Sequence, residues 1–178
     1  MIKFMVTEKL STKDLCASFD YTTSALLQLI SSVSAKKLNT VPFAGSWTAA
    51  QVGEHLLKSY AIVDVLNGPV KKTERQPGEK IESIREVFLD FTIKMTAPEF
   101  IIPTGNLIDK ELLLFNLQSR LAQIKEVVQT KDLSEICTSW SLPKLGELTR
   151  LEWVHFILYH TQRHNHQLQN IFESLENA

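Results

Sequence analysis

Hydrophobic residues recur along the chain at steps of three and four positions, the spacing that places side chains on one face of an α-helix. This periodicity predicts four long helices and one weaker helix, over residues 11–35, 49–66, 107–128 and 149–175 and over 81–95. No segment shows the strict alternation of a half-buried β-strand, and no internal repeat is visible. The pattern therefore predicts an all-α protein.

Helix breakers separate these segments. All six prolines and five of the six glycines fall in four patches, at residues 42–45, 68–78, 98–105 and 143–146. Two segments also begin with a capping box, formed by Thr48 with Gln51 and by Thr149 with Glu152. Four long helices and at least two long connections predict a four-helix bundle, a single domain over residues 1–178. The remaining glycine, Gly53, lies inside a predicted helix, and we expect a close approach between helices there.

Composition and charge narrow the class of protein. Hydrophobic residues make up 44% and charged residues 22% of the chain, as in an ordinary globular protein. The formal net charge of −1 offers no basic excess for a phosphate backbone, so we expect no nucleic-acid partner. Polar residues interrupt the first ten positions, MIKFMVTEKL, which argues against a signal peptide, and no apolar run is long enough for a membrane span. Cys16 and Cys137 show no motif spacing, which favours reduced thiols and a cytoplasmic location.

Histidines gather near the end of the chain, where LYHTQRHNHQLQNI (158–171) holds three of the five. A metal site, a set of buried imidazoles that hydrogen-bond to their neighbours, or a solvent-exposed helix face would each explain this cluster of histidines. His160 and His164 are four positions apart, on one helix face at the edge of the apolar side, and such a pair can converge on one ion. By the same geometry His155 and His166 point elsewhere, and we expect both at the surface or the rim.

A third inward histidine is predicted in the second long helix. His55 lies on its apolar side, with Val52 and Leu56, where an unpaired polar ring would be costly. Three neutral imidazoles from two helices suit Zn²⁺, Ni²⁺, Fe²⁺ or Cu²⁺ and leave a coordination position open. The residue pattern alone leaves a structural role for the three rings equally open.

Three stretches carry a resemblance to the DinB/YfiT-like superfamily of metal-binding four-helix-bundle proteins. SWTAAQVGEHLLKS contains the family's tryptophan, capped helix and histidine, here Trp47 and His55. LPKLGELTRLEWVHF is similar to its approach to the last helix, and HTQRHNHQLQNI to its HxxxH motif. The resemblance implies a DinB/YfiT-like bundle with His55, His160 and His164 as metal ligands, and a homodimer as a frequent state.

The resemblance also implies candidate chemistry, because family members include thiol S-transferases, metal-dependent isomerases and hydrolases. A Zn²⁺, Ni²⁺ or Fe²⁺ ion with three neutral ligands would activate a bound water or a thiolate, the catalytic group in either case. Glu54 and Glu152 are poorly placed as a general base, so we favour a transferase that uses a low-molecular-weight thiol on a small-molecule electrophile over a hydrolase. A non-catalytic metal-binding or stress-response bundle is the third hypothesis. Arg163 and Gln167 are candidates for contacts with the substrate or with the ligands.

Overall fold

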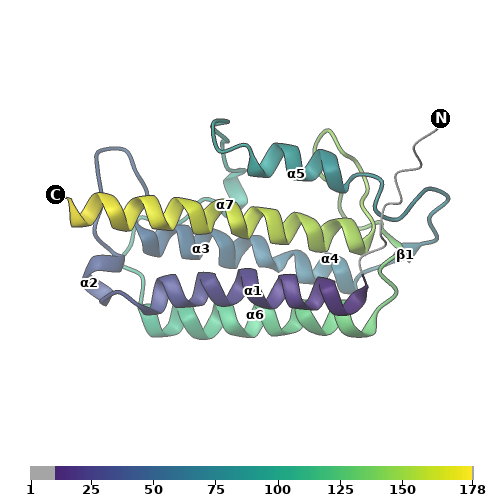
Figure 1. The fold of residues 1–178 in the computed structure, drawn as a ribbon, viewed down its shortest axis with the longest axis horizontal. Helices are drawn as coiled ribbons and strands as arrows, with labels where there is room; N and C mark the ends of the chain where they lie inside the picture. The colour runs from purple at the N-terminus through teal and green to yellow at the C-terminus, as the bar shows by residue number, and fades with distance from the viewer. Residues whose placement is uncertain (1–10, 178) are drawn as a thin grey trace, which may run out of the picture.

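The structure is a computed structural model that describes residues 11–177 (Figure 1). The prediction about the first ten residues lies outside this range. The helices and strands of the structure, in chain order, are α1 (Thr12–Ser31), α2 (Ala35–Leu38), α3 (Ala49–Ser59), η1 (Tyr60–Ile62), α4 (Val63–Asn67), β1 (Val70–Lys71), α5 (Ile81–Leu89), η2 (Glu99–Ile101), α6 (Lys110–Thr130), β2 (Ile136–Cys137) and α7 (Arg150–Glu176). The predicted all-α class is confirmed.

Four long helical segments form a bundle: α1, α3 continued by η1 and α4, α6, and α7. Helix α1 packs against α6 and α7, and α3 packs against the same two helices. In Figure 1, α1 and α7 begin at the right-hand end and α3 and α6 at the left-hand end. Because α3 and α6 run in the same direction, a long crossover (68–109) must return the chain to the starting end. This crossover carries α5, which packs on α7 outside the bundle.

Local signals in the sequence explain most helix ends. Both predicted capping boxes are present: the Thr48 hydroxyl accepts from the Gln51 N–H at 3.1 Å, and Thr149 and Glu152 form the same arrangement. The predicted helix over 11–35 ends earlier, at Ser31, and a 3₁₀ turn between α3 and α4 interrupts the predicted helix over 49–66. The predicted helix over 81–95 ends at Leu89.

A small β-sheet corrects the expectation that the chain contains no strands. Strands β1 and β2 are antiparallel, with Val70 opposite Cys137 and Lys71 opposite Ile136. Two residues are too few to show a period-two pattern, so the sequence held no signal for them. The sheet joins the start of the crossover to the connection between α6 and α7.

Gly53 lies where three helices meet, as predicted. A Cβ atom at this position would lie 2.9 Å from Cδ2 of Leu113 on α6 and 3.2 Å from Cδ1 of Ile30 on α1. The first distance is shorter than real Cβ contacts allow, so the Leu113 side chain would have to move to admit any larger residue. The absence of a side chain thus permits close packing near His55, two residues further along α3.

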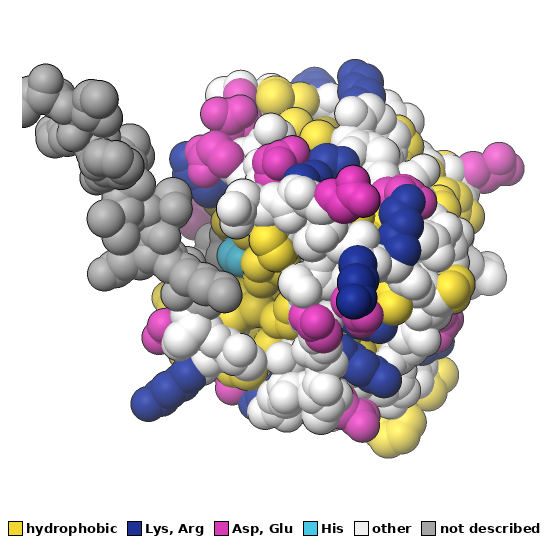
Figure 2. Space-filling model, turned by 90° about the vertical axis from the view of Figure 1, so that its right-hand side faces the viewer, with side chains coloured by type: hydrophobic (Ala, Val, Ile, Leu, Met, Phe, Trp, Pro, Cys, Tyr) yellow, Lys and Arg dark blue, Asp and Glu magenta, His cyan; other side chains and the backbone are white. Residues whose placement is uncertain are grey.

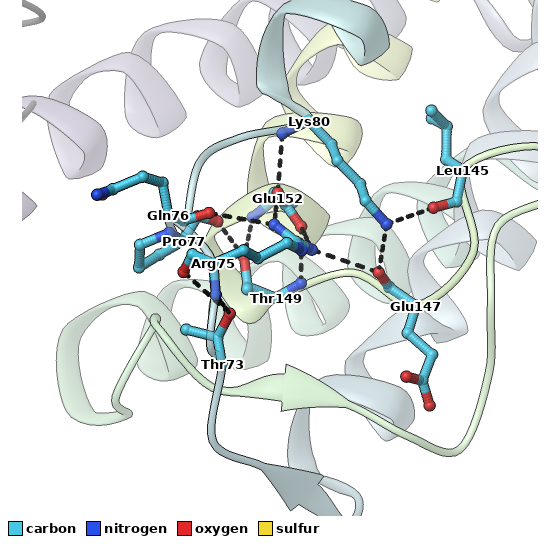
Figure 3. A network of polar contacts seen from close by, with 9 residues as sticks. All are labelled: Thr73, Arg75, Gln76, Pro77, Lys80, Leu145, Glu147, Thr149 and Glu152. Carbon is cyan, nitrogen blue, oxygen red and sulfur yellow. Dashed lines mark hydrogen bonds and ion pairs between the residues drawn. The ribbon is translucent and has the colours of Figure 1, made fainter.

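A buried carboxylate fixes the beginning of α7 (Figure 3). Glu152 is fully buried, and its two oxygens accept from the Arg75 guanidinium, both at 2.6 Å, and from the backbone N–H groups of Lys80 and Thr149, both at 2.9 Å. The Thr149 hydroxyl donates to the carbonyl of Pro77 at 2.6 Å. These bonds tie residues 75–80 of the crossover to the N-terminus of α7 and so set the position of the helix that carries His160 and His164.

The end of the bundle where α1 and α7 begin carries charges of both signs. Figure 2 shows lysine, arginine, aspartate and glutamate side chains interspersed there with hydrophobic ones. Within residues 11–177, no helix combines the length and the apolar character needed to cross a membrane.

Candidate metal centre

Three histidines meet in the interior between α3 and α7, and we call them the histidine triad. His55 comes from the middle of α3, and His160 and His164 lie one turn apart on α7. Only 3%, 6% and 8% of their respective surfaces are exposed. One ring nitrogen from each lies within 4.8 Å of the others. The structure therefore brings together the three histidines that the sequence singled out.

The ring nitrogens of the triad converge through their Nε2 atoms. His160 Nε2 lies 3.1 Å from Nε2 of His55 and 3.0 Å from Nε2 of His164. Two nitrogens each bound at about 2.1 Å to one ion lie roughly 3 to 4 Å apart, depending on the angle between them. The observed separations fall in this range, although they are also short enough for hydrogen bonds.

The hydrogen bonds made by Nδ1 of His55 and of His164 help to distinguish a metal site from a set of rings that hydrogen-bond to one another. His55 Nδ1 lies 3.0 Å from the carbonyl oxygen of Ile101, which can only accept, so His55 carries its proton on Nδ1. His164 Nδ1 lies 2.8 Å from Oε1 of Gln167 and donates to it in the same way. Each of these neutral rings consequently presents a lone pair, and no proton, at Nε2.

Two lone pairs therefore face His160, which can supply at most one proton at Nε2. A proton on His160 Nε2 can point straight at only one of these two lone pairs, so at least one of the two short nitrogen–nitrogen contacts has no straight hydrogen bond, which is unfavourable in a buried site. A cation placed between the three nitrogens would satisfy all of them. This donor set of neutral imidazoles with fixed tautomers fits a divalent transition metal.

Protonation does not offer another way to relieve the contact. Burial lowers the pKa of His55, lowers the pKa of His160 well below its ordinary value, and lowers the pKa of His164 to about 3. The neighbouring rings add to the effect on His160 and His164, because each would repel a second positive charge. The triad is thus neutral at physiological pH, which is the state that binds a metal.

Aromatic side chains enclose the triad. Trp47 lies 5.3 Å from the ring of His55, while Phe88 of α5 and Phe156 of α7 lie 5.6 Å and 5.5 Å from that of His160, measured between centroids. Phe156 could have been found from its spacing of four residues before His160, but nothing in the sequence indicated that α5 would bring Phe88 to the site.

A segment of the crossover covers the triad; we call residues 90–109 the η2 segment. Its Ile101 carbonyl contacts His55 directly, a contact that no pattern in the sequence predicts. The segment is fixed to α3 by Lys58 Nζ, which donates to Ile102 O at 2.7 Å, and by Glu54, whose carboxylate accepts from the Thr104 N–H at 2.7 Å. Both side chains of α3 therefore hold the loop that orients a triad histidine.

The two other polar residues predicted near the site have different surroundings. Gln167 bonds to His164 and so fixes its tautomer. The Arg163 guanidinium donates to the backbone carbonyls of Phe88, Asp90 and Ile93 and thereby holds the end of α5 and the beginning of the η2 segment against α7. These contacts give Arg163 a role in building the site wall.

The expectation for His155 was wrong, because this residue is buried, with 7% of its surface exposed. Its Nδ1 atom has no hydrogen-bond partner among the described residues, and burial lowers its pKa to about 4. Helix α7 is flanked by α5 as well as by α1 and α3, so more of its circumference is covered than in a simple bundle. His166 is half-buried, stacked on Phe91 with centroids 4.3 Å apart, which agrees with a rim position.

The fold and the site together define a class: a four-helix bundle with a buried three-histidine group that could hold a metal ion. The sequence model of the DinB superfamily matches residues 18–168, and the chain belongs to that superfamily. It is also similar to a protein of Bacillus subtilis (strain 168) that bears the name uncharacterized protein YuaE. The two are 29% identical over 159 residues, which cover 82% of this chain and 90% of that protein. No solved structure matches the chain.

Proposed function

We propose that this protein is a metal-dependent transferase that joins a low-molecular-weight thiol to a small electrophilic substrate. The observation that carries the proposal is the buried triad of neutral imidazoles, whose converging lone pairs call for a cation. His55, His160 and His164 would hold Zn²⁺ or Ni²⁺, or alternatively Fe²⁺. Such an ion, when bound, supplies a full +2 charge that lowers the pKa of a thiol at the open position.

The protein's own groups contribute orientation and exclusion of water. The Ile101 carbonyl and Gln167 keep Nε2 of His55 and His164 free of protons and directed inward. Phe88, Phe156 and Trp47 surround the triad with apolar surface. A thiolate in such a poorly hydrated site is a strong nucleophile, because little solvent must be removed before it attacks.

The surroundings of the nearby carboxylates favour thiol transfer over hydrolysis, the second candidate. Hydrolysis needs a general base beside the attacking water, whereas a thiolate attacks without one. The Glu54 carboxylate accepts a hydrogen bond from the Thr104 N–H, and its Oε1 lies 3.4 Å from Nζ of Lys58. The Glu152 carboxylate accepts from the Arg75 guanidinium at the start of α7. Neither carboxylate is free to accept a proton near the triad.

Metal content and thiol conjugation test the proposal in sequence. Elemental analysis of the untagged protein should give about one transition metal per chain, and His164→Ala should lose it. His166→Ala is the matched control on the same helix and should keep it. The metal-loaded protein should then conjugate a model electrophile with at least one thiol of a low-molecular-weight panel, and chelation should abolish turnover.

The outcomes separate the three hypotheses. Metal binding without conjugation by any thiol would refute the transferase and leave a hydrolase or a non-catalytic metal-binding or stress-response protein. Absence of metal after reconstitution with Zn²⁺ and Ni²⁺ would refute the metal centre itself. A cytoplasmic location belongs to the same proposal, and the two free cysteines, Cys16 and Cys137, support a reducing compartment.

A further inference from the structure

The η2 segment is the least tightly packed part of the enclosure around the triad. No residue from 90 to 109 is buried, whereas Phe88 and Phe156, which enclose the triad from two helices, are 7% and 9% exposed. Several apolar side chains of the segment face solvent, each with at least 43% of its surface exposed: Phe91, Ile93, Met95, Phe100, Ile102 and Leu107. The hydrophobic effect therefore contributes little to holding the segment in place.

Hydrogen bonds fix both ends of the segment. At its beginning, the Arg163 guanidinium donates to the carbonyls of Asp90 and Ile93. Near its end, the side-chain amide of Asn39 donates to the carbonyl of Ile108 and accepts from the N–H of the same residue, both at 3.0 Å. The part between these two anchors can therefore move without displacing either end.

Three polar side chains of α3 hold the part between the anchors. Gln51 Nε2 donates to the carbonyl of Thr104 at 2.9 Å, and the Glu54 carboxylate accepts from the N–H and the hydroxyl of Thr104 at 2.7 and 3.0 Å. Lys58 Nζ donates to the carbonyl of Ile102 at 2.7 Å. All these hydrogen bonds are exposed, so water can replace either partner, and breaking each one costs little free energy.

The same part of the segment contacts the triad. Ile101 directly precedes these attachment points, and its carbonyl accepts from Nδ1 of His55 at 3.0 Å. Because the triad is buried, a metal ion or a substrate can reach it only after some part of the enclosure moves. The η2 segment is the part whose movement exposes the least apolar surface, and such weakly held segments are the ones that open locally in folded proteins.

We propose that the η2 segment is a lid, which moves away from α3 between its two anchors and admits the metal ion and the substrate to the triad. Gln51, Glu54 and Lys58 keep the lid closed, and we call them the latch residues. The length of the segment supports this role, because connections longer than about 12 to 15 residues are usually functional, as active-site lids are. The inference rests on the metal centre of the proposed function, but not on the identity of the reaction.

Two latch variants of opposite charge test the lid. Glu54→Ala removes a negative charge and Lys58→Met a positive one, so any electrostatic effect on a bound cation would differ in sign between them. A weaker latch acts in the same direction in both variants. Each should accelerate both the uptake of Zn²⁺ and its release to a chromogenic chelator by about three- to tenfold, as expected for a lost hydrogen bond. The dissociation constant should stay unchanged, because a lid affects both rates equally.

Asp20→Ala is the matched control for the latch variants. It removes a carboxylate that bonds to Lys125 between α1 and α6, and it should leave both zinc rates unchanged. Unaltered rates in both latch variants, or rate changes of opposite sign in the two, would overturn the inference. A changed dissociation constant in place of changed rates would do so as well.

Chemical modification of the metal-free protein tests the lid without a metal. Diethyl pyrocarbonate acylates a neutral imidazole nitrogen that it can reach, and peptide mass spectrometry follows each histidine separately. Each latch variant should accelerate the modification of His55 by about three- to tenfold. His166, half-buried at the rim, is the internal control and should react at one rate in all the proteins. Equal acceleration at His166 would show a general loosening of the fold and would overturn the lid.

Failure of the lid is distinguishable from failure of the proposed function. Thiol conjugation by the metal-loaded protein, combined with latch variants that change neither the zinc rates nor the modification of His55, would refute the lid alone. Faster modification of His55 in the latch variants of a protein that binds no metal would refute the proposed function while the lid stands.

Discussion

Replacing His155 with phenylalanine tests whether a buried, unpaired imidazole weakens this fold in acid. The substitution keeps a flat ring beside Tyr159 and removes both titratable nitrogens. Burial lowers the pKa of His155 in the folded protein to about 4, from 6.5 as the ordinary value. As the pH falls below 6.5, the unfolded chain gains a proton that the folded protein does not, so protonation favours unfolding.

The size of the effect follows from these two pKa values. Between pH 7 and pH 5, a group with a pKa of 6.5 when unfolded and about 4 when folded lowers the free energy of unfolding by about 2 kcal/mol. The effect is absent above pH 7, grows through the interval from 6.5 to 4, and levels off below pH 4. His155→Phe should lack this contribution.

Urea unfolding of the original protein and of His155→Phe, at pH 7 and pH 5 in the presence of a chelator, measures this contribution of His155 to the free energy of unfolding. The triad histidines titrate in both proteins, so their contribution cancels in the difference. The original protein should lose about 2 kcal/mol more than His155→Phe between the two pH values. Parallel losses would show that His155 can take up a proton in the folded state, and its burial would then not be what sets its pKa.

Three further substitutions probe the site and the frame around it. Gln167→Ala should weaken zinc binding by roughly 10- to 100-fold, because His164 loses the partner that fixes its tautomer; competition with a chromogenic chelator measures this, and unchanged affinity would contradict it. Gly53→Ala should lower the free energy of unfolding by about 1 kcal/mol, since overpacking outweighs the gain in helix propensity. Gly105→Ala is the control, because a Cβ atom there meets nothing within 4 Å. Equal stabilities of the two variants would contradict the packing argument. Arg75→Ala should destabilise the fold by about 3–5 kcal/mol at pH 7, because it leaves the Glu152 charge buried and unpaired; a loss below about 1 kcal/mol in thermal unfolding would refute that.

The sequence was sufficient to predict the bundle and the meeting of the triad, because both depend on helical periodicity. His55, His160 and His164 each lie on the apolar side of a long helix, and two such helices of one bundle bury those sides together. The capping boxes at Thr48 and Thr149 were equally local signals. These features need only relations between residues a few positions apart.

The parts that sequence reasoning missed arise from the long crossover. The contacts of Ile101 and Phe88 with the triad depend on where α5 and the η2 segment lie against α7 and α3. Those positions are fixed by side chains that bond to distant backbone groups, such as Arg163 to Phe88 and Asp90. No periodic pattern records such contacts, so only the three-dimensional structure could show them.

The Glu152 carboxylate has a consequence for how the protein opens. It accepts hydrogen bonds both from the first residues of α7 and from residues 75–80. If either of these two segments moves away from Glu152, the hydrogen bonds of the other segment become exposed to solvent. The backbone amides of Lys80 and Thr149, both bonded to this carboxylate, should therefore exchange with solvent at nearly the same rate. Residues 75–80 of the crossover and the first turn of α7 would then open as one cooperative unit.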